Sequence, residues 1–130
     1  MNSEENYMTF ESFVFDSYAF FEILKGNENY NKYKNAEIVT TKLNLFEVYL
    51  GVLREHNEES AEKILNKYYD FAIDFDRKVI TEAAKFKKKV NKRDLSMTDC
   101  ISYILACQLG IKFLTGDKEF EGMEDVEFVK

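Results

Sequence analysis

Residues 13–16 read Phe-Val-Phe-Asp, an apolar run of strand type that ends in a carboxylate. The pattern returns at residues 111–117, Ile-Lys-Phe-Leu-Thr-Gly-Asp, where an apolar run is again followed by an aspartate. Strands this apolar are typical of parallel sheets that are covered on both faces. In such sheets ligands bind beyond the carboxyl ends of the strands. The two stretches therefore predict a parallel sheet with Asp16 and Asp117 at its ligand-binding edge.

The rest of the chain alternates helical and strand patterns, which predicts an α/β fold with helices on both faces of the sheet. Helices are expected over 18–25, 42–55, about 60–69, 77–91 and from Ser96 or Thr98 to Leu109, with a short helix or loop over 28–35 and one turn over 118–121. Strands are expected over 13–16, 37–40, 71–74, 111–115 and 126–129.

Length and composition indicate a single domain with its own core. The chain has 130 residues, no proline and a formal net charge of −6. This charge argues against a general electrostatic attraction to nucleic acid, although it leaves room for a local basic strip. The two cysteines lie seven residues apart on one expected helix, about 10 Å from each other and too far for a disulfide. With no signal-peptide pattern and no apolar run of about 20 residues, the sequence predicts a cytosolic protein.

Two further acids stand where a carboxylate is unusual. Glu47 lies within the apolar stripe that Leu43, Phe46, Leu50 and Leu53 are expected to form on the helix over 42–55. Asp99 opens the next helix behind Thr98. An unpaired buried carboxylate is costly, and a shared divalent ion compensates several at once. Asp16, Glu47, Asp99 and Asp117 together therefore predict the acidic pocket of a metal-dependent hydrolase.

Each acid also has an ordinary structural explanation when it is taken alone. The three aspartates are typical of helix caps and turns. Glu47 is equally consistent with a helix that rotates slightly, so that its carboxylate reaches solvent or pairs with Lys42 or Arg54. His56 is the single histidine, which excludes a histidine-rich zinc site and fits a solvated helix end. What favours the acidic pocket is the placement of all four acids at one sheet edge.

The only dense positive run comprises Lys85, Lys87, Lys88, Lys89, Lys92 and Arg93. A solvated helix face explains most of its members. A strip that contacts the phosphate backbone of RNA, formed by Lys87, Lys88, Lys89 and Arg93, is the functional interpretation, and the two are compatible.

Three segments together resemble the PIN-domain ribonucleases, especially the toxin ribonucleases of VapBC toxin–antitoxin pairs. They are Phe-Val-Phe-Asp-Ser-Tyr at 13–18, the helix with a glutamate at 41–51, and 95–120, with its helix-opening aspartate, strand and final aspartate. The resemblance covers almost the whole chain and implies a three-layer α/β/α sandwich with a central, mostly parallel sheet of four or five strands. It implies one domain over 1–130, with a short polar tail over 1–11.

The resemblance also implies the chemistry. Asp16, Glu47, Asp99 and Asp117 would hold one or two Mg²⁺ or Mn²⁺ ions, and a water activated by the metal would attack an RNA phosphodiester. The donors that orient these acids would be Ser17 for Asp16 and Thr98 for Asp99, and Asn44 would contact a carboxylate or the substrate. Two positions depart from the family pattern: Glu119 where an Asp is frequent, and Gly116 where an Arg is frequent.

The implied function is that of an endoribonuclease toxin that a cognate antitoxin neutralises and that forms a homodimer. One alternative is an RNA-processing or RNA-decay nuclease of the same fold without an antitoxin. Another is a non-catalytic α/β signalling or interaction module of the phosphoacceptor type. Residues 71–74 would supply its middle-strand aspartate, but the early acid pair that such a module needs is missing.

Overall fold

The sheet has four parallel strands in the order β2-β1-β3-β4. In the computed structural model, which describes residues 11–91 and 93–130, these strands are β1 (Ser12–Phe15), β2 (Glu37–Val39), β3 (Lys112–Thr115) and β4 (Val126–Phe128). Val14 is in register with Val39 of β2 on one side and with Phe113 of β3 on the other. The parallel sheet predicted from the two apolar runs is thus confirmed, and β1 and β3 are its central strands.

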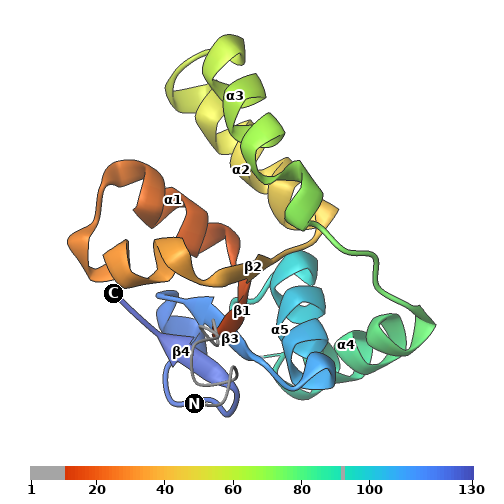
Figure 1. The fold of residues 1–130 in the computed structure, drawn as a ribbon. Helices are drawn as coiled ribbons and strands as arrows, with labels where there is room; N and C mark the ends of the chain where they lie inside the picture. Colours follow the sequence, from red (N-terminus) through yellow and green to blue (C-terminus); the bar gives the residue numbers. More distant parts are fainter. Residues whose placement is uncertain (1–10, 92) are drawn as a thin grey trace, which may run out of the picture.

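Helices cover both faces of this sheet (Figure 1). Side chains alternate along the central strands, so that Phe15 and Leu114 join one core cluster while Val14 and Phe113 join the other. The three-layer α/β/α architecture is therefore confirmed. The helical elements are α1 (Ser17–Lys25), η2 (Glu28–Asn35), α2 (Lys42–Glu55), α3 (Glu58–Tyr68), η3 (Tyr69–Phe71), α4 (Arg77–Lys89), α5 (Met97–Leu109) and η4 (Lys118–Phe120), where η marks 3₁₀ turns.

The strand expected over 71–74 is wrong. Phe71 ends the 3₁₀ turn η3, and only Ala72 makes a bridge, to Thr40. Phe71, Ile73 and Asp74 are exposed, so this stretch has neither of the two covered faces that an inner parallel strand requires. It is the extended connection between the α2–α3 hairpin and α4, visible at the right of Figure 1. The phosphoacceptor alternative thereby loses its middle-strand aspartate.

The apolar stripe expected on α2 is also wrong. Phe46 is 67% exposed and Leu53 is 41% exposed, whereas the buried face consists of Asn44, Leu45, Val48 and Val52. Leu45, Val48 and Val52 have the same helical spacing as the expected Leu43, Phe46 and Leu50, displaced by two residues. The face toward the sheet therefore carries a buried asparagine, and Glu47 lies half-buried at its border.

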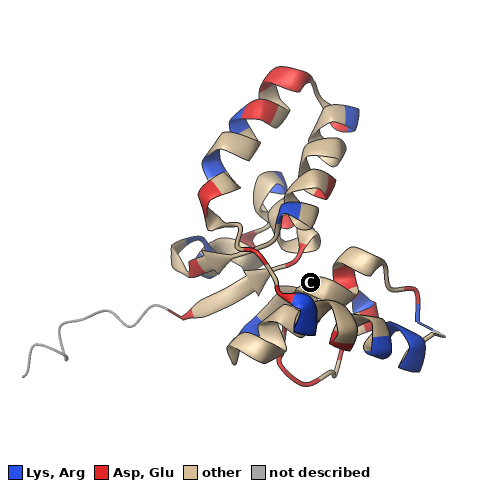
Figure 2. Cartoon of the chain, turned by 90° about the vertical axis from the view of Figure 1, so that its right-hand side faces the viewer, with Lys and Arg blue, Asp and Glu red and all other residues tan. Residues whose placement is uncertain are grey.

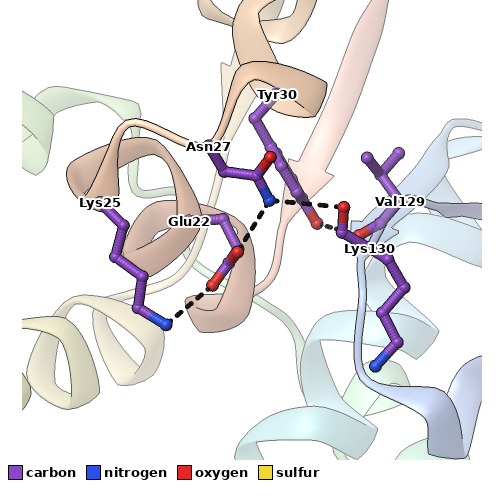
Figure 3. A network of polar contacts seen from close by, with 6 residues as sticks. All are labelled: Glu22, Lys25, Asn27, Tyr30, Val129 and Lys130. Carbon is purple, nitrogen blue, oxygen red and sulfur yellow. Dashed lines mark hydrogen bonds and ion pairs between the residues drawn. The ribbon is translucent and has the colours of Figure 1, made fainter.

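The end of the described chain is anchored to the turn after α1 (Figure 3). The Tyr30 hydroxyl donates to the Val129 carbonyl oxygen at 2.6 Å, and Asn27 Nδ2 donates to Glu22 at 2.8 Å. Asn29 Nδ2 donates to the carbonyl oxygen of Lys130 at 2.9 Å. The bonds from Tyr30 and Asn29 hold the segment after β4 beside the turn that follows α1, next to the carboxyl ends of the central strands.

Other local expectations agree with the structure. Gly26 and Gly110 end α1 and α5 in the left-handed conformation, with φ of 80° and 72°. Cys100 and Cys107 are both free, and His56 is an exposed residue at the end of α2. Over the described residues, no helix combines the length and apolarity that a membrane span requires.

Candidate active site

Asp16 lies between the carboxyl ends of the two central strands and is only 2% exposed. Its Oδ1 accepts the Ser17 N–H at 2.8 Å, which caps α1, and its Oδ2 accepts the Thr115 hydroxyl at 2.6 Å. Within the part of the chain that the structure describes, no lysine or arginine forms an ion pair with it. Burial, reinforced by the charges of Asp99 and Glu47, raises the pKa of Asp16 to about 8.

Asp99 lies half-buried in the first turn of α5. It forms a capping box with Ser96: the Ser96 N–H donates to Asp99 Oδ2 at 2.9 Å, and the Asp99 N–H donates to Ser96 Oγ at 3.1 Å. Burial raises the pKa of Asp99, and the charges of Glu47 and Asp117 raise it further. The charges of Asp99 and Glu47 act on the pKa of Asp16, and those of Glu47 and Asp117 act on the pKa of Asp99, so all four predicted site acids lie around the same edge of the sheet.

Glu47 approaches this edge from α2. Its Oε1 accepts the Ser17 hydroxyl at 2.6 Å, so the half-buried carboxylate turns toward α1. The alternative in which Glu47 pairs with Lys42 is not what the structure shows, because Lys42 lies 4.0 Å from Asp74 instead. Ser17, expected to orient Asp16, donates its backbone N–H to Asp16 and its hydroxyl to Glu47.

Asp117 caps the 3₁₀ turn η4 after β3. Its Oδ1 accepts the Glu119 N–H at 3.0 Å, and its own N–H donates to the Thr115 hydroxyl at 3.1 Å. Thr115, which the sequence analysis missed, therefore links Asp16 to Asp117 through one fully buried hydroxyl. The Glu119 carboxylate accepts the Asp94 N–H at 3.4 Å, on the connection between α4 and α5.

Gly116 explains one departure from the family pattern. A Cβ atom at this position would collide with the Val129 carbonyl oxygen and with the ring of Tyr18. The approach of the segment after β4 to the end of β3 therefore leaves no room for the arginine that the family often has here.

Asn44 and Thr98, the other two predicted donors, are both buried, on α2 and α5. Asn44 Nδ2 donates to Ser17 Oγ at 3.1 Å, so it contacts the acids through Ser17. Among the hydrogen bonds of the described residues, Asp99 receives its donors from Ser96, and none comes from Thr98.

The predicted basic strip divides into two groups. Lys87 Nζ donates to the Leu95 carbonyl oxygen and Arg93 donates to the Glu119 carbonyl oxygen, so both attach the α4–α5 connection to the domain. Lys88 and Lys89 are exposed at the end of α4, where Figure 2 shows basic residues gathered. Lys92 lies outside the described residues.

The donor set of the four acids suits a hard divalent cation, because every ligand atom is a carboxylate oxygen. The hydrogen bonds above use one or two of the roughly four acceptor positions of each carboxylate. Even so, across residues 11–91 and 93–130, no three Asp, Glu, His or Cys side chains lie close enough to share one ion. Asp99 and Asp117 direct carboxylate oxygens to the N–H groups of Ser96 and Glu119 that they cap.

Comparison with known proteins identifies the fold. The sequence model of the PIN domain family matches residues 13–126 of this chain. No curated protein sequence matches the chain. A toxin–antitoxin complex from Klebsiella pneumoniae is similar in structure with a TM-score of 0.68 and 17% identity, over 88% of this chain and 95% of that one.

Two VapBC structures resemble this chain to a similar extent. VapBC2 from Rickettsia felis, bound to a DNA fragment from its promoter, has a TM-score of 0.70 and 16% identity, covering 92% of this chain and 99% of that one. VapBC-1 from nontypeable Haemophilus influenzae has a TM-score of 0.70 and 15% identity, covering 90% and 96%. At such identities the likeness establishes the fold alone, whereas the family match spans most of the chain. The chain therefore belongs to the PIN domain family.

Proposed function

We propose that this protein is a Mg²⁺- or Mn²⁺-dependent endoribonuclease, and that Asp16, Glu47, Asp99 and Asp117 hold the metal. The observation that carries the proposal is Asp16, a buried carboxylate with two acidic neighbours and no cation partner among the described residues. Such a group is costly in a folded protein unless a cation compensates it. A PIN domain retains it because the cation is a cofactor.

The groups around Asp16 orient its carboxylate and surround it with negative charge. The Thr115 hydroxyl and the Ser17 N–H each donate to one Asp16 oxygen, which keeps the carboxylate oriented when no ion is present. Glu47, Asp99 and Asp117 are half-buried and add negative charge around it. A bound divalent ion supplies Lewis acidity, lowering the pKa of a coordinated water and neutralising charge on the phosphodiester.

The biological role we propose is that of a toxin with a cognate antitoxin. Its support is that the structural neighbours named above come from toxin–antitoxin complexes and that this chain covers 95–99% of the matched chain in each. A short neighbouring reading frame whose product binds this protein and inhibits cleavage is the expected finding. Active protein without such an inhibitor would favour the RNA-processing alternative.

The direct test is cleavage of a panel of structured and single-stranded RNAs with Mg²⁺, with Mn²⁺ and with a chelator. We expect internal cleavage of RNA only in the presence of a divalent ion, and none by the Asp99→Asn variant. The asparagine retains the shape of the side chain and an acceptor for the Ser96 N–H, so that helix α5 keeps its cap. Cleavage that survives the chelator, or an Asp99→Asn variant as active as wild type, would refute the metal-dependent mechanism.

The divided basic strip allows a prediction about RNA binding. Replacing both Lys88 and Lys89 by Gln should weaken binding about 2- to 10-fold at low salt and reduce the slope of log K against log salt by up to about two. Folding should be unaffected because both side chains are exposed. Filter binding at several salt concentrations with the Asp99→Asn protein measures this without cleavage. The matched control is Lys63 with Lys67 on α3, also exposed, and an equal slope change there would show a general charge effect.

A further inference from the structure

We propose that Ser102 on α5 is a positioning residue of the candidate site: through Asn44 it orients the Ser17 hydroxyl toward Glu47. This inference rests on the proposed function, because it assigns Glu47 to the metal site. The inference goes beyond the proposed function because it adds Ser102, together with Thr41, to the residues that set the geometry of the acids.

The contacts form one continuous chain between α5 and α2. The Ser102 hydroxyl donates to Asn44 Oδ1 at 2.6 Å, and the Thr41 hydroxyl donates to the same oxygen at 2.6 Å. Asn44 Nδ2 donates to Ser17 Oγ at 3.1 Å, and Ser17 Oγ donates to Glu47 Oε1 at 2.6 Å. Ser102, Asn44 and Thr41 are each 0% exposed. No water from the solvent is needed to complete the chain.

The direction of these bonds follows from the charge of Glu47. A carboxylate oxygen can only accept a hydrogen bond, so the Ser17 hydroxyl must be the donor to Glu47. Ser17 Oγ then needs a donor from Asn44, which places Nδ2 toward Ser17 and Oδ1 toward Ser102 and Thr41. Two hydroxyl donors on Oδ1 stabilise this orientation of the amide over the flipped one. Ser102 therefore acts on Glu47 from two residues away.

The burial of these side chains indicates that their hydrogen-bond network has a role beyond packing. Burying four polar side chains between helices lowers the stability of the fold unless every polar group is hydrogen-bonded. Apolar side chains would fill the same space without this requirement. Here every buried side-chain polar atom of the described residues has a partner. A fully paired buried network permits one arrangement, which is what a ligand carboxylate requires to meet an ion at a set position.

The test is Mn²⁺ affinity in the absence of RNA, measured by calorimetry or by the paramagnetic resonance of free Mn²⁺. We expect Ser17→Ala to weaken Mn²⁺ binding about 10-fold, at the lower end of the range for direct partners of ligand side chains, and Ser102→Ala, which acts through two further residues, to weaken it less, by about 3- to 10-fold. If Ser102 acts through Ser17, the double variant should bind Mn²⁺ no worse than Ser17→Ala alone. Independent, multiplying losses would overturn the proposal.

Tyr103→Phe is the matched control. It also removes one hydroxyl from α5, but that hydroxyl donates to the Glu124 carbonyl oxygen at 2.9 Å, away from the acids. It should lower the melting temperature in chelator and leave Mn²⁺ affinity unchanged. A Ser102→Ala protein that behaves in the same way would show a purely structural role and refute the positioning role alone. Wild-type protein that does not bind Mn²⁺ would overturn the proposed function as well.

Discussion

Asp16→Asn should abolish RNA cleavage, with a loss of at least about 10²- to 10³-fold in kcat. Asparagine has the shape of aspartate, so the cap of α1 and the contact with Thr115 can both be retained. What disappears is the negative charge at the deepest point of the site, between the two central strands. Cleavage of a fluorescent RNA under saturating Mn²⁺ measures the loss, and circular dichroism verifies that the variant is folded.

Asp76→Asn is the control for this experiment. Asp76 caps α4 as Asp16 caps α1, with its Oδ1 accepting the Val79 N–H at 3.1 Å, but it is exposed and belongs to a different helix end. It should cost stability, up to about 1 kcal/mol for a weakened cap, and leave cleavage unchanged. Equal activity in the two variants would mean that Asp16 is a cap and nothing more.

The sheet, and the positions of Asp16 and Asp117 at its edge, could be predicted from local patterns because the two signals coincide. Apolar runs that end in aspartate mark buried strands and their carboxyl ends at once, as Asp16 and Asp117 demonstrate. The helix expected over 42–55 begins at Lys42, with Thr41 as its cap, and of the two expected starts Ser96 and Thr98 it is Ser96 that caps α5.

The orientation of α2 could not be predicted. Its sequence offers two sets of apolar residues with the same helical spacing, one containing Phe46 and one containing Val48, and spacing alone does not rank them. Tertiary contacts decide: Asn44 pairs with Ser17 and Ser102, which turns the face that includes Val48 inward. The prediction of a strand over 71–74 was wrong for a related reason. A short apolar run carries no information on whether a neighbouring strand is available to pair with it.

Ser17 was among the expected donors, but Thr115 and Ser102 were missed because serine and threonine are common and carry no periodic signal. Thr115 stands two residues before Asp117, at the end of a strand, and that position is the one local clue to its role. Ser102 has no such clue, since it lies among apolar residues in the middle of α5 and its partner Asn44 lies 58 positions earlier in the chain.

The stability of the metal-free protein should fall as the pH rises from about 4 to 8. The pKa of Asp16 is about 8 in the folded protein, against 3.8 for an exposed aspartate. Between these values the folded state keeps a proton that the unfolded state releases, so the folded state is favoured at the acidic end and loses this advantage as the pH approaches 8. The raised pKa of Asp99 acts in the same direction.

Comparison of wild type with Asp16→Asn isolates this effect from other titrating groups. At about 1.4 kcal/mol per pH unit, roughly three units between pH 4 and 7 give the variant an advantage of up to about 4 kcal/mol at pH 7, and little at pH 4. Urea unfolding in chelator at each pH measures the difference. Saturating Mn²⁺ at pH 7.5 should then raise the melting temperature of wild type more than that of the variant, because the ion binds only the folded, deprotonated site. Parallel pH curves for the two proteins would show that Asp16 is ionised at neutral pH without any cation, and the physical basis for a metal at this sheet edge would be lost.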